Sequence, residues 1–216
     1  MLHIDPATDM LAVIDVQPTF MPGGELPVPG GDEIVPLINH LLRDRFTVAF
    51  ATQDWHPRGH LSFASAHPGA RPFDIATLPY GPQVLWPDHA IQGTPNAALH
   101  PGLDRDRLQM ILRKGSNPAI DSYSAFTEND HKTSTGLAGW LHARGIRRVF
   151  LCGLATDFCV AWSAEDAITN GFEAVILEDA CRGIASPGEG GRDSLTVARR
   201  RLAARGIALR QTAELG

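Results

Sequence analysis

The hydrophobic positions of the chain fall into short runs separated by longer stretches in which apolar and polar residues mix. Several runs are continuous rather than alternating, as in Leu11-Ala12-Val13-Ile14. Continuous apolar runs are typical of strands buried on both faces, which occur in parallel sheets covered by helices. The predicted strands lie at residues 10–16, 46–52, 108–112, 148–152, 173–177 and 207–210.

The stretches between these runs have the mixed pattern of amphipathic helices. Gly145 and Gly171 stand where helix C-caps are expected, and a predicted strand follows each of them closely. Strands and helices therefore alternate, which predicts an α/β fold, a three-layer α/β/α sandwich. The predicted helices lie near residues 32–43, 133–144, 157–170 and 191–205.

Residues 55–105 depart from this pattern, because they are rich in Pro, Gly and His and show little periodicity. An irregular stretch of that length inside a compact domain is usually functional. No linker divides the sequence, so we expect a single domain over residues 1–216. Gly188-Glu189-Gly190-Gly191 lacks the Lys-Ser/Thr ending of a phosphate loop, and a plain helix start is expected there.

Composition narrows the classes of protein to consider. The chain has 216 residues, of which 44% are hydrophobic and 20% charged, as in a globular domain with a substantial core. A net charge of −5 gives no reason to expect binding to nucleic acid or to an anionic membrane. No apolar run approaches the ~18 residues of a membrane span, and the first residues do not resemble a signal peptide. Three cysteines without a Cys-x-x-Cys pair indicate reduced thiols and a cytoplasmic location.

Four chemically reactive residues stand at or just past the ends of predicted strands: Asp15, Asp54, Lys114 and Cys159. In open α/β sheets, ligands bind at the carboxyl ends of the strands. Cys159 also lies at the start of a predicted helix, where the helix dipole favours a thiolate and therefore a nucleophile. The alternative for any cysteine is a small buried hydrophobic residue. Asp15 and Lys114 offer a carboxylate and an ammonium to accompany the thiol.

A second group of residues resembles a metal site. Asp54 and His56 are two apart on extended backbone and so point the same way, and Trp86-Pro87-Asp88-His89 supplies another imidazole. Two histidines and one aspartate leave coordination positions open, as in catalytic sites, and suit zinc, iron or manganese. His60 is a fourth ligand, an outer partner or a loop residue without contact, and a solvated loop is the alternative for the whole group. Three further histidines show no partner pattern and are expected to be solvated: His67, His100 and His131.

These residues occur in segments that together resemble one known family. The chain resembles the nicotinamidase (pyrazinamidase) group of the isochorismatase-like cysteine hydrolases from the first predicted strand to at least the fifth. Ala90, where relatives often have Cys, and the variable loop Arg58-Gly59 are the departures. The matching segments are Asp15-Val16-Gln17 with Phe20, Thr52-Gln53-Asp54-Trp55-His56-Pro57, Trp86-Pro87-Asp88-His89, Lys114-Gly115 and Gly153-Leu154-Ala155-Thr156-Asp157-Phe158-Cys159-Val160.

The resemblance implies a six-stranded parallel sheet and a specific activity. That activity is hydrolysis of nicotinamide, and of pyrazinamide, to the acid and ammonia through a cysteine thioester, in NAD salvage. It implies one divalent metal ion, with zinc first and iron or manganese as alternatives, and a cis peptide bond before Thr156 in Leu154-Ala155-Thr156. The implied catalytic triad is Cys159, Asp15 and Lys114, and the implied metal ligands are Asp54, His56 and His89.

Several neighbouring residues take supporting roles in this hypothesis. The backbone N–H groups of Ala155 and Cys159 are expected to form the oxyanion hole. Asp157 is expected to cap the helix that carries the nucleophile, and Gln17 to hold the first loop. A flat pocket would be lined by Phe20, Trp86 and Tyr123, with Leu26 a weaker candidate, although each could be ordinary core packing.

Two other functions compete with this hypothesis. One is a hydrolase of the same superfamily that acts on another small amide or on a vinyl ether, and the metal cluster favours the nicotinamidase branch over it. The other is a non-catalytic nucleotide-binding module, but no Gly-x-Gly-x-x-Gly follows the first strand. The expected partner is a small molecule, and association into a homo-oligomer is left open.

Overall fold

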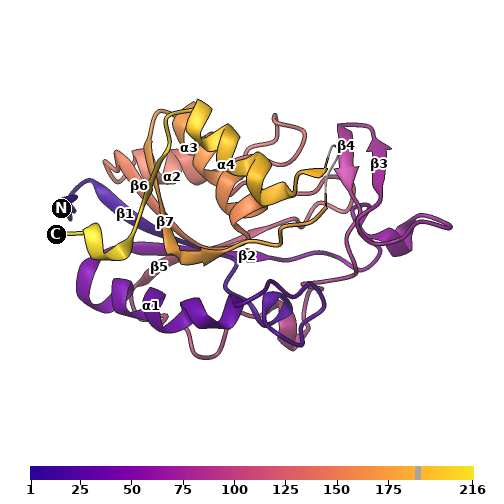
Figure 1. The fold of residues 1–216 in the computed structure, drawn as a ribbon, viewed down its shortest axis with the longest axis horizontal. Helices are drawn as coiled ribbons and strands as arrows, with labels where there is room; N and C mark the ends of the chain where they lie inside the picture. Colours follow the sequence, from indigo (N-terminus) through magenta and orange to yellow (C-terminus); the bar gives the residue numbers. More distant parts are fainter. Residues whose placement is uncertain (188–190) are drawn as a thin grey trace.

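A computed structural model describes residues 1–187 and 191–216 (Figure 1). In the described residues, a six-stranded sheet has the order β5-β2-β1-β6-β7-β8, and every neighbouring pair is parallel. The parallel sheet predicted from the apolar runs is therefore confirmed. Its strands are β1 (Asp9–Ile14), β2 (Ala49–Asp54), β5 (Leu108–Lys114), β6 (Arg148–Leu154), β7 (Glu173–Arg182) and β8 (Ala208–Arg210).

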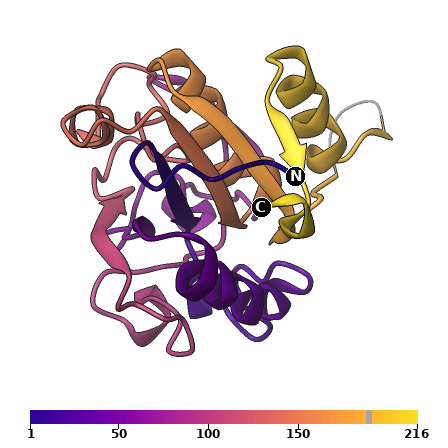
Figure 2. The same ribbon diagram turned by 90° about the vertical axis from the view of Figure 1, so that its left-hand side faces the viewer.

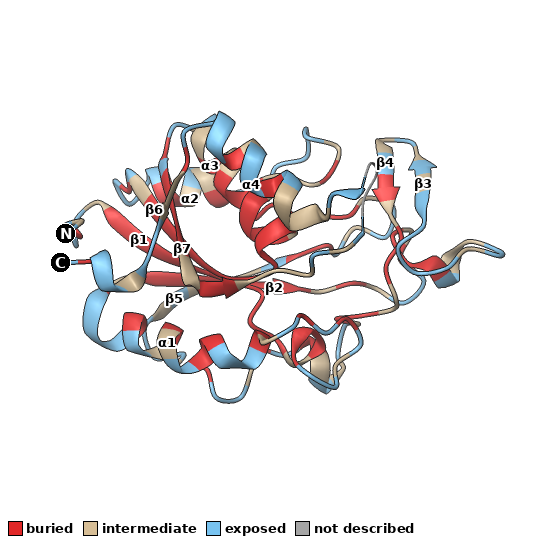
Figure 3. Cartoon of the chain, in the orientation of Figure 1, coloured by how far each residue is buried: buried red, intermediate tan, exposed pale blue. Residues whose placement is uncertain are grey.

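Helices cover both faces of this sheet. The helical stretch around α1 (Val35–His40) packs on one face, and α2 (Leu137–His142), α3 (Ala161–Thr169) and α4 (Ser194–Ala204) lie on the other (Figures 1 and 2). Every residue of β1 and β2 is buried, as expected for central strands between two helical layers (Figure 3). The three-layer α/β/α sandwich is confirmed.

The helix boundaries differ from the predicted ones at several ends. A 3₁₀ turn (Gly31–Ile34) precedes α1 and a π-helical turn (Leu41–Arg45) follows it, so the first helical run extends past its predicted limits. The π-helical turn Thr156–Val160 likewise precedes α3. The second predicted helix begins later, because Gly136 adopts a left-handed conformation with φ of 87°.

The last helix, α4, is capped by a side chain: Asp193 accepts a hydrogen bond from the backbone N–H of Thr196 at 2.7 Å. Residues 188–190 of the glycine-rich motif that precedes it lie outside the described residues. Further 3₁₀ turns occupy Pro18–Phe20, Ala64–Ala66, Pro95–Ala97 and Thr212–Glu214.

The stretch 55–105 contains an antiparallel hairpin that sequence periodicity did not predict. It consists of β3 (Ile75–Leu78) and β4 (Gly81–Val84) and forms a separate two-stranded sheet beside the main one (Figure 1). Both strands are four residues long, and β4 begins Gly81-Pro82, a pattern typical of turns. Because its strands are short and its composition is typical of turns, this hairpin could not be predicted from sequence periodicity.

The strand order places a switch point in the middle of the sheet. The chain runs outward from β1 to β2 and β5 on one side, and to β6, β7 and β8 on the other. Gly153, near the end of β6, has φ of +116°, and a Cβ there would lie 2.1 Å from the carbonyl oxygen of Ile14. Only glycine allows β1 and β6 to approach this closely at their carboxyl ends.

Among the described residues, no helix has both the length and the apolar character needed to span a lipid bilayer.

Candidate active site

Lys114 is the centre of a buried polar cluster at the carboxyl edge of the sheet. Its ammonium lies 2.8 Å from Asp15 Oδ2 and 3.3 Å from Cys159 Sγ, and it donates to Asp54 Oδ1 and, at 2.9 Å, to the carbonyl of Ser122. Burial alone would lower the pKa of Lys114, but the two carboxylates raise that pKa well above its ordinary value. The lysine therefore stays charged and holds three of the predicted reactive groups together.

Asp15 follows β1 directly and is fully buried. Its backbone is in the left-handed region, with φ of 49°, which turns the side chain out of the strand direction. Oδ1 accepts a 2.6 Å hydrogen bond from the Thr52 hydroxyl, which in turn accepts from the backbone N–H of Asp15 at 3.1 Å. Burial and the nearby Asp54 raise the pKa of Asp15, and Lys114 opposes this shift. The carboxyl group is thus a stronger base than an exposed aspartate.

Cys159 lies in the helical turn that follows β6, and 8% of its surface is exposed. Its sulfur is within 4.8 Å of carboxylate oxygens of both Asp15 and Asp54. Burial raises the pKa of the Cys159 thiol well above its ordinary value, Lys114 lowers it, and Asp15 raises it further. Burial therefore opposes the thiolate that the position at a helix start favours, and Lys114 partly offsets this effect.

All three cysteines lie in the described part of the chain, and all are buried, free thiols. Cys152 and Cys181 sit in strands β6 and β7, where burial raises the pKa of each. They pack as apolar core residues, in contrast to Cys159, which faces charged neighbours.

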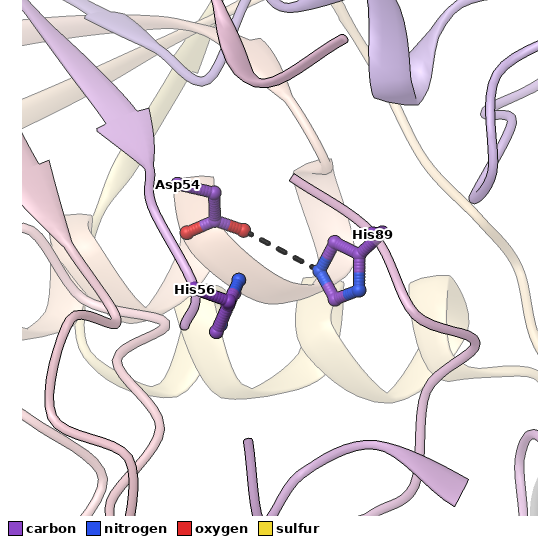
Figure 4. A group of neighbouring side chains, drawn as sticks. All are labelled: Asp54, His56 and His89. Atoms are coloured by element: carbon purple, nitrogen blue, oxygen red, sulfur yellow. Dashed lines mark ion pairs between the residues drawn. The ribbon is translucent and has the colours of Figure 1, made fainter. Parts of the chain in front are cut away.

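Asp54, His56 and His89 bring one potential ligand atom each within 4.8 Å of one another (Figure 4). His89 Nε2 lies 3.6 Å from Asp54 Oδ2, while His89 Nδ1 donates to the carbonyl of Pro87 at 2.8 Å. Burial would raise the pKa of Asp54, but Lys114 and the two histidines lower it, so this carboxylate is ionised. The donor set of two imidazoles and one carboxylate fits a divalent cation such as zinc.

His60 lies beside this group, but both of its ring nitrogens already take part in hydrogen bonds. Its Nε2 lies 2.7 Å from the carbonyl of Asn117, and its Nδ1 accepts from the backbone N–H of Ser62 at 3.1 Å. A carbonyl can only accept, so the proton is on Nε2 and the Nδ1 lone pair is occupied.

The three histidines expected to be solvated have local partners. His67 Nε2 is 2.8 Å from the Leu61 carbonyl, His100 Nδ1 accepts from the backbone N–H of Gly102, and His131 stacks on Trp162. None of the three belongs to the polar cluster. The expectation is right for exposed His131 but wrong for His67 and His100, which are partly buried by their local contacts.

A narrow pocket opens above the cluster. Trp86 Nε1 donates to the Tyr123 hydroxyl at 3.0 Å, and the Trp86 ring meets Phe158 edge-on with 4.8 Å between centroids. Flat aromatic walls of this kind suit a planar ring. The pocket is lined by Phe20, Leu26, Asp54, Trp86, His89, Asp121, Tyr123, Ala155, Phe158, Cys159 and Ile184.

Sequence reasoning missed three residues that line this pocket, Asp121, Phe158 and Ile184. Phe158 directly precedes Cys159, and an aromatic residue beside a candidate nucleophile could have been weighed as a pocket wall. Asp121 is buried, and its Oδ1 lies 3.0 Å from His56 Nε2. Burial alone would raise the pKa of Asp121, but His56 lowers it to about 2. Nothing in the local pattern distinguishes this aspartate, since its partner is 65 residues away.

Two supporting roles can be compared directly with the structure. Asp157 does not cap its own helix: it accepts from the backbone N–H groups of Ile184 and Ala185, which are in the loop after β7, so that expectation is wrong. Gln17 does hold the first loop, because its side chain donates to the Asp54 carbonyl and accepts from the Asp54 N–H. The ends of β1 and β2 are thereby fixed together.

The backbone between β6 and Cys159 contains a cis peptide bond, as the family resemblance implies, but it lies one bond before the expected position. It joins Leu154 to Ala155 rather than preceding Thr156. Ala155 lines the pocket beside Cys159.

Comparisons with known proteins identify the family. The isochorismatase domain model matches residues 9–207, which is most of the chain. A nicotinamidase of Acinetobacter baylyi is 56% identical over 174 residues, covering 81% of each chain. The chain belongs to the isochorismatase family. The resemblance seen in the sequence motifs is therefore confirmed at the level of the whole fold.

Solved structures of this family are similar throughout. An Acinetobacter baumannii nicotinamidase is 48% identical with a TM-score of 0.92, covering 98% of this chain and 99% of that one. A protein of L. infantum in complex with nicotinate is 38% identical with a TM-score of 0.85, covering 100% of this chain and 98% of that one. A Pyrococcus horikoshii pyrazinamidase in complex with zinc is 34% identical with a TM-score of 0.73, covering 94% and 98%.

Proposed function

We propose that this isochorismatase-family chain is a nicotinamidase, which hydrolyses nicotinamide to nicotinic acid and ammonia. The observation that carries the proposal is the contact of Lys114 with Asp15, Asp54 and Cys159 at the base of an aromatic pocket. The 56% identity to a nicotinamidase supports the same assignment. A nucleotide-binding module would leave these buried charges without a role.

In the first half-reaction, the Cys159 sulfur attacks the amide carbon of the substrate. The thiol proton passes to Asp15, and the carbon–sulfur bond forms as the carbonyl oxygen takes up the electron pair. Collapse of this intermediate breaks the carbon–nitrogen bond, and Asp15 returns the proton to the departing nitrogen as ammonia. A thioester between the acyl group and Cys159 remains.

In the second half-reaction, water adds to the thioester and the steps run in reverse. Asp15 accepts a proton from the water and passes it to the sulfur, which leaves as the carbon–sulfur bond breaks. The acid is released and the free thiol is restored. The raised pKa of Asp15 suits both roles, since the group must accept a proton and release it in each cycle.

The pKa directions in the resting site explain why Asp15 and Lys114 are needed together. The Cys159 thiol holds its proton because it is buried, and a base within a few ångströms is required to remove it. Lys114 lies 3.3 Å from the sulfur and 2.8 Å from Asp15, so it favours the thiolate when that forms. The N–H groups of Ala155 and Cys159 are proposed to stabilise the oxyanion.

Asp54, His56 and His89 are proposed to hold one divalent ion, with zinc as first choice and iron or manganese as alternatives. An ion bound there would offer a Lewis-acid site at the pocket wall, suited to a ring nitrogen or to water. The three side chains are buried, and Asp54 and His89 line the same pocket as Cys159, so an ion held there would face the pocket that contains the sulfur.

Phe20, Trp86, Tyr123 and the additional residue Phe158 are proposed to stack on the flat pyridine ring. Pyrazinamide has a ring of the same shape and is a second expected substrate. Supply of nicotinic acid for NAD salvage in the cytoplasm is the proposed physiological role, with nicotinamide as the small-molecule partner.

The test is ammonia release from nicotinamide by the purified, zinc-loaded protein. Turnover is expected with the wild type and with a Cys181→Ala variant, in which a thiol outside the pocket is removed. Absence of ammonia release from nicotinamide, together with turnover of another small amide, would transfer the assignment to another hydrolase of the superfamily.

A further inference from the structure

One ring nitrogen of His56 has a hydrogen-bond partner in the described part of the chain, and the other has none. Its Nε2 is 3.0 Å from Asp121 Oδ1, whereas its Nδ1 is buried and has no hydrogen-bond partner among the described residues. A buried polar atom without a partner is rare in native proteins and calls for an explanation. Figure 4 shows a ring nitrogen of His56 directed toward the space between Asp54 and His89.

The contact with Asp121 determines which nitrogen carries the proton. The Asp121 carboxylate is ionised and can only accept, so His56 donates from Nε2, and the neutral ring that binds a cation has its lone pair on Nδ1. The same carboxylate accepts from the backbone N–H of Ser122 at 2.8 Å and from Gln83 Nε2 at 3.2 Å. Its position is therefore fixed by its own loop and by the β3–β4 hairpin.

The imidazole has little freedom to move away from this contact. Gly115, with φ of +68°, passes directly beneath the ring, and a Cβ at that position would lie 2.7 Å from His56 Nε2. Glycine thus lets the chain after Lys114 pass close enough to support the ring. Asp121 and Gly115 together hold the imidazole from two sides.

An alternative reading makes Asp121 a metal ligand itself, because His56, His60 and Asp121 also form a compact cluster. The hydrogen bonds argue against that reading. Both nitrogens of His60 are occupied, by Asn117 and Ser62, so the second cluster lacks a free imidazole. In His56, by contrast, Nδ1 has no hydrogen-bond partner among the described residues and Nε2 contacts Asp121. Asp121 is therefore the hydrogen-bond partner of a metal ligand and not a ligand itself.

We infer that Asp121 is a positioning residue, which fixes the proton of His56 on Nε2 and so presents Nδ1 to the cation held with Asp54 and His89. His89 is held in the opposite tautomer, because its Nδ1 donates to the Pro87 carbonyl and leaves Nε2 free. The two histidines therefore present different nitrogens to the same point. A carboxylate or carbonyl behind a ligating histidine raises its basicity and fixes its orientation. The inference rests on the proposed metal site.

Zinc affinity tests this inference independently of turnover. Metal-stripped wild type, Asp121→Ala and Asp121→Asn are titrated with zinc against a competing chelator. We expect a loss of about 10- to 100-fold in affinity for Asp121→Ala and a smaller loss for Asp121→Asn, whose amide oxygen can still accept. Asp130→Asn, which changes a partly exposed carboxylate in the same connection between β5 and α2, is the matched control and should bind zinc as the wild type does.

A second measurement reads the tautomer directly and needs no variant to fold. Long-range ¹H–¹⁵N spectra of the zinc-loaded wild type should show the His56 proton on Nε2 and the His89 proton on Nδ1. Unchanged zinc affinity in both Asp121 variants, or a proton on His56 Nδ1, would overturn the inference. Loss of zinc affinity in a protein that never hydrolyses nicotinamide would instead refute the proposed function and leave the positioning role standing.

Discussion

Lys114 and Asp54 are direct partners in the register of the parallel strands β5 and β2, and the lysine ammonium donates to the aspartate carboxylate. The same ammonium contacts Asp15 and Cys159. One side chain therefore joins the proposed cleavage residues to the proposed cation ligands. A change in charge on Asp54 alters the electrostatic environment of Lys114 and, through it, the ionisation of the Cys159 thiol. The two parts of the site therefore cannot be altered separately.

Replacing Lys114 with methionine should reduce both stability and activity. The change leaves Asp15 and Asp54 buried without their counter-charge, which costs about 3–5 kcal/mol in the free energy of unfolding. Denaturant unfolding of the metal-free proteins measures this cost. Lys132→Met is the control, since Lys132 is exposed and is the only other lysine in the sequence. Equal stability of the two variants would contradict the central role of Lys114.

Replacing Cys159 with alanine should lower kcat for nicotinamide by more than about 10³-fold, because the covalent route is lost. The fold should survive, since the side chain becomes smaller and Lys114, which donates to the sulfur, keeps Asp15, Asp54 and the Ser122 carbonyl as partners. Acid-quenched wild type should carry the acyl group as a mass increase on the peptide containing Cys159. An acyl group found on another residue would show that the nucleophile has been misassigned.

The acid limb of the pH–rate profile should lie above the ordinary aspartate pKa of 3.8. Asp15 must be ionised to accept the thiol proton, and burial next to Asp54 raises its pKa, so activity is lost at a higher pH than for an exposed carboxylate. Measuring kcat/KM of the zinc-loaded enzyme against pH gives this limb. A limb at or below 3.8 would mean that the group that titrates is not Asp15.

Gly153→Ala should destabilise the protein by about 3 kcal/mol or more, because the new Cβ meets the Ile14 carbonyl and φ is +116°. Gly139→Ala provides the matched control within helix α2, where a Cβ meets nothing within 4 Å. That change should stabilise the fold by about 0.5–1 kcal/mol through helix propensity. Thermal unfolding of both variants compares the two predictions, and similar midpoints would disprove the close approach of β1 and β6.

The sheet was predictable because continuous apolar runs such as Leu11 to Ile14 leave little choice but a strand covered on both faces. The β3–β4 hairpin was not, since four-residue strands beside Gly81-Pro82 have too short a pattern to detect. Helix ends set by a single left-handed residue, such as Gly136, were also missed. The local pattern predicted the layers, whereas the left-handed conformation of Gly136 determined where α2 begins.

The candidate site also has features that the sequence predicts and features that it does not. Asp15, Asp54, Lys114 and Cys159 were predictable together because parallel strands deliver their ends to one edge. Their ionisation was not, since the raised pKa of the Cys159 thiol depends on burial that a sequence does not state. Asp121 was also beyond reach, because its importance comes from a contact made only in the folded chain.

The two chain ends lie side by side, joined by a bridge between Leu2 and Leu215 and by a 2.6 Å hydrogen bond from Leu2 N–H to the Glu214 carbonyl (Figure 1). They sit at the opposite end of the molecule from the hairpin and from the carboxyl ends of the strands. A purification tag, a surface tether or a fused reporter could therefore be attached at either end without obstructing the pocket mouth. A short peptide that joins the two ends would also permit circular permutation, with the new termini placed in an exposed loop.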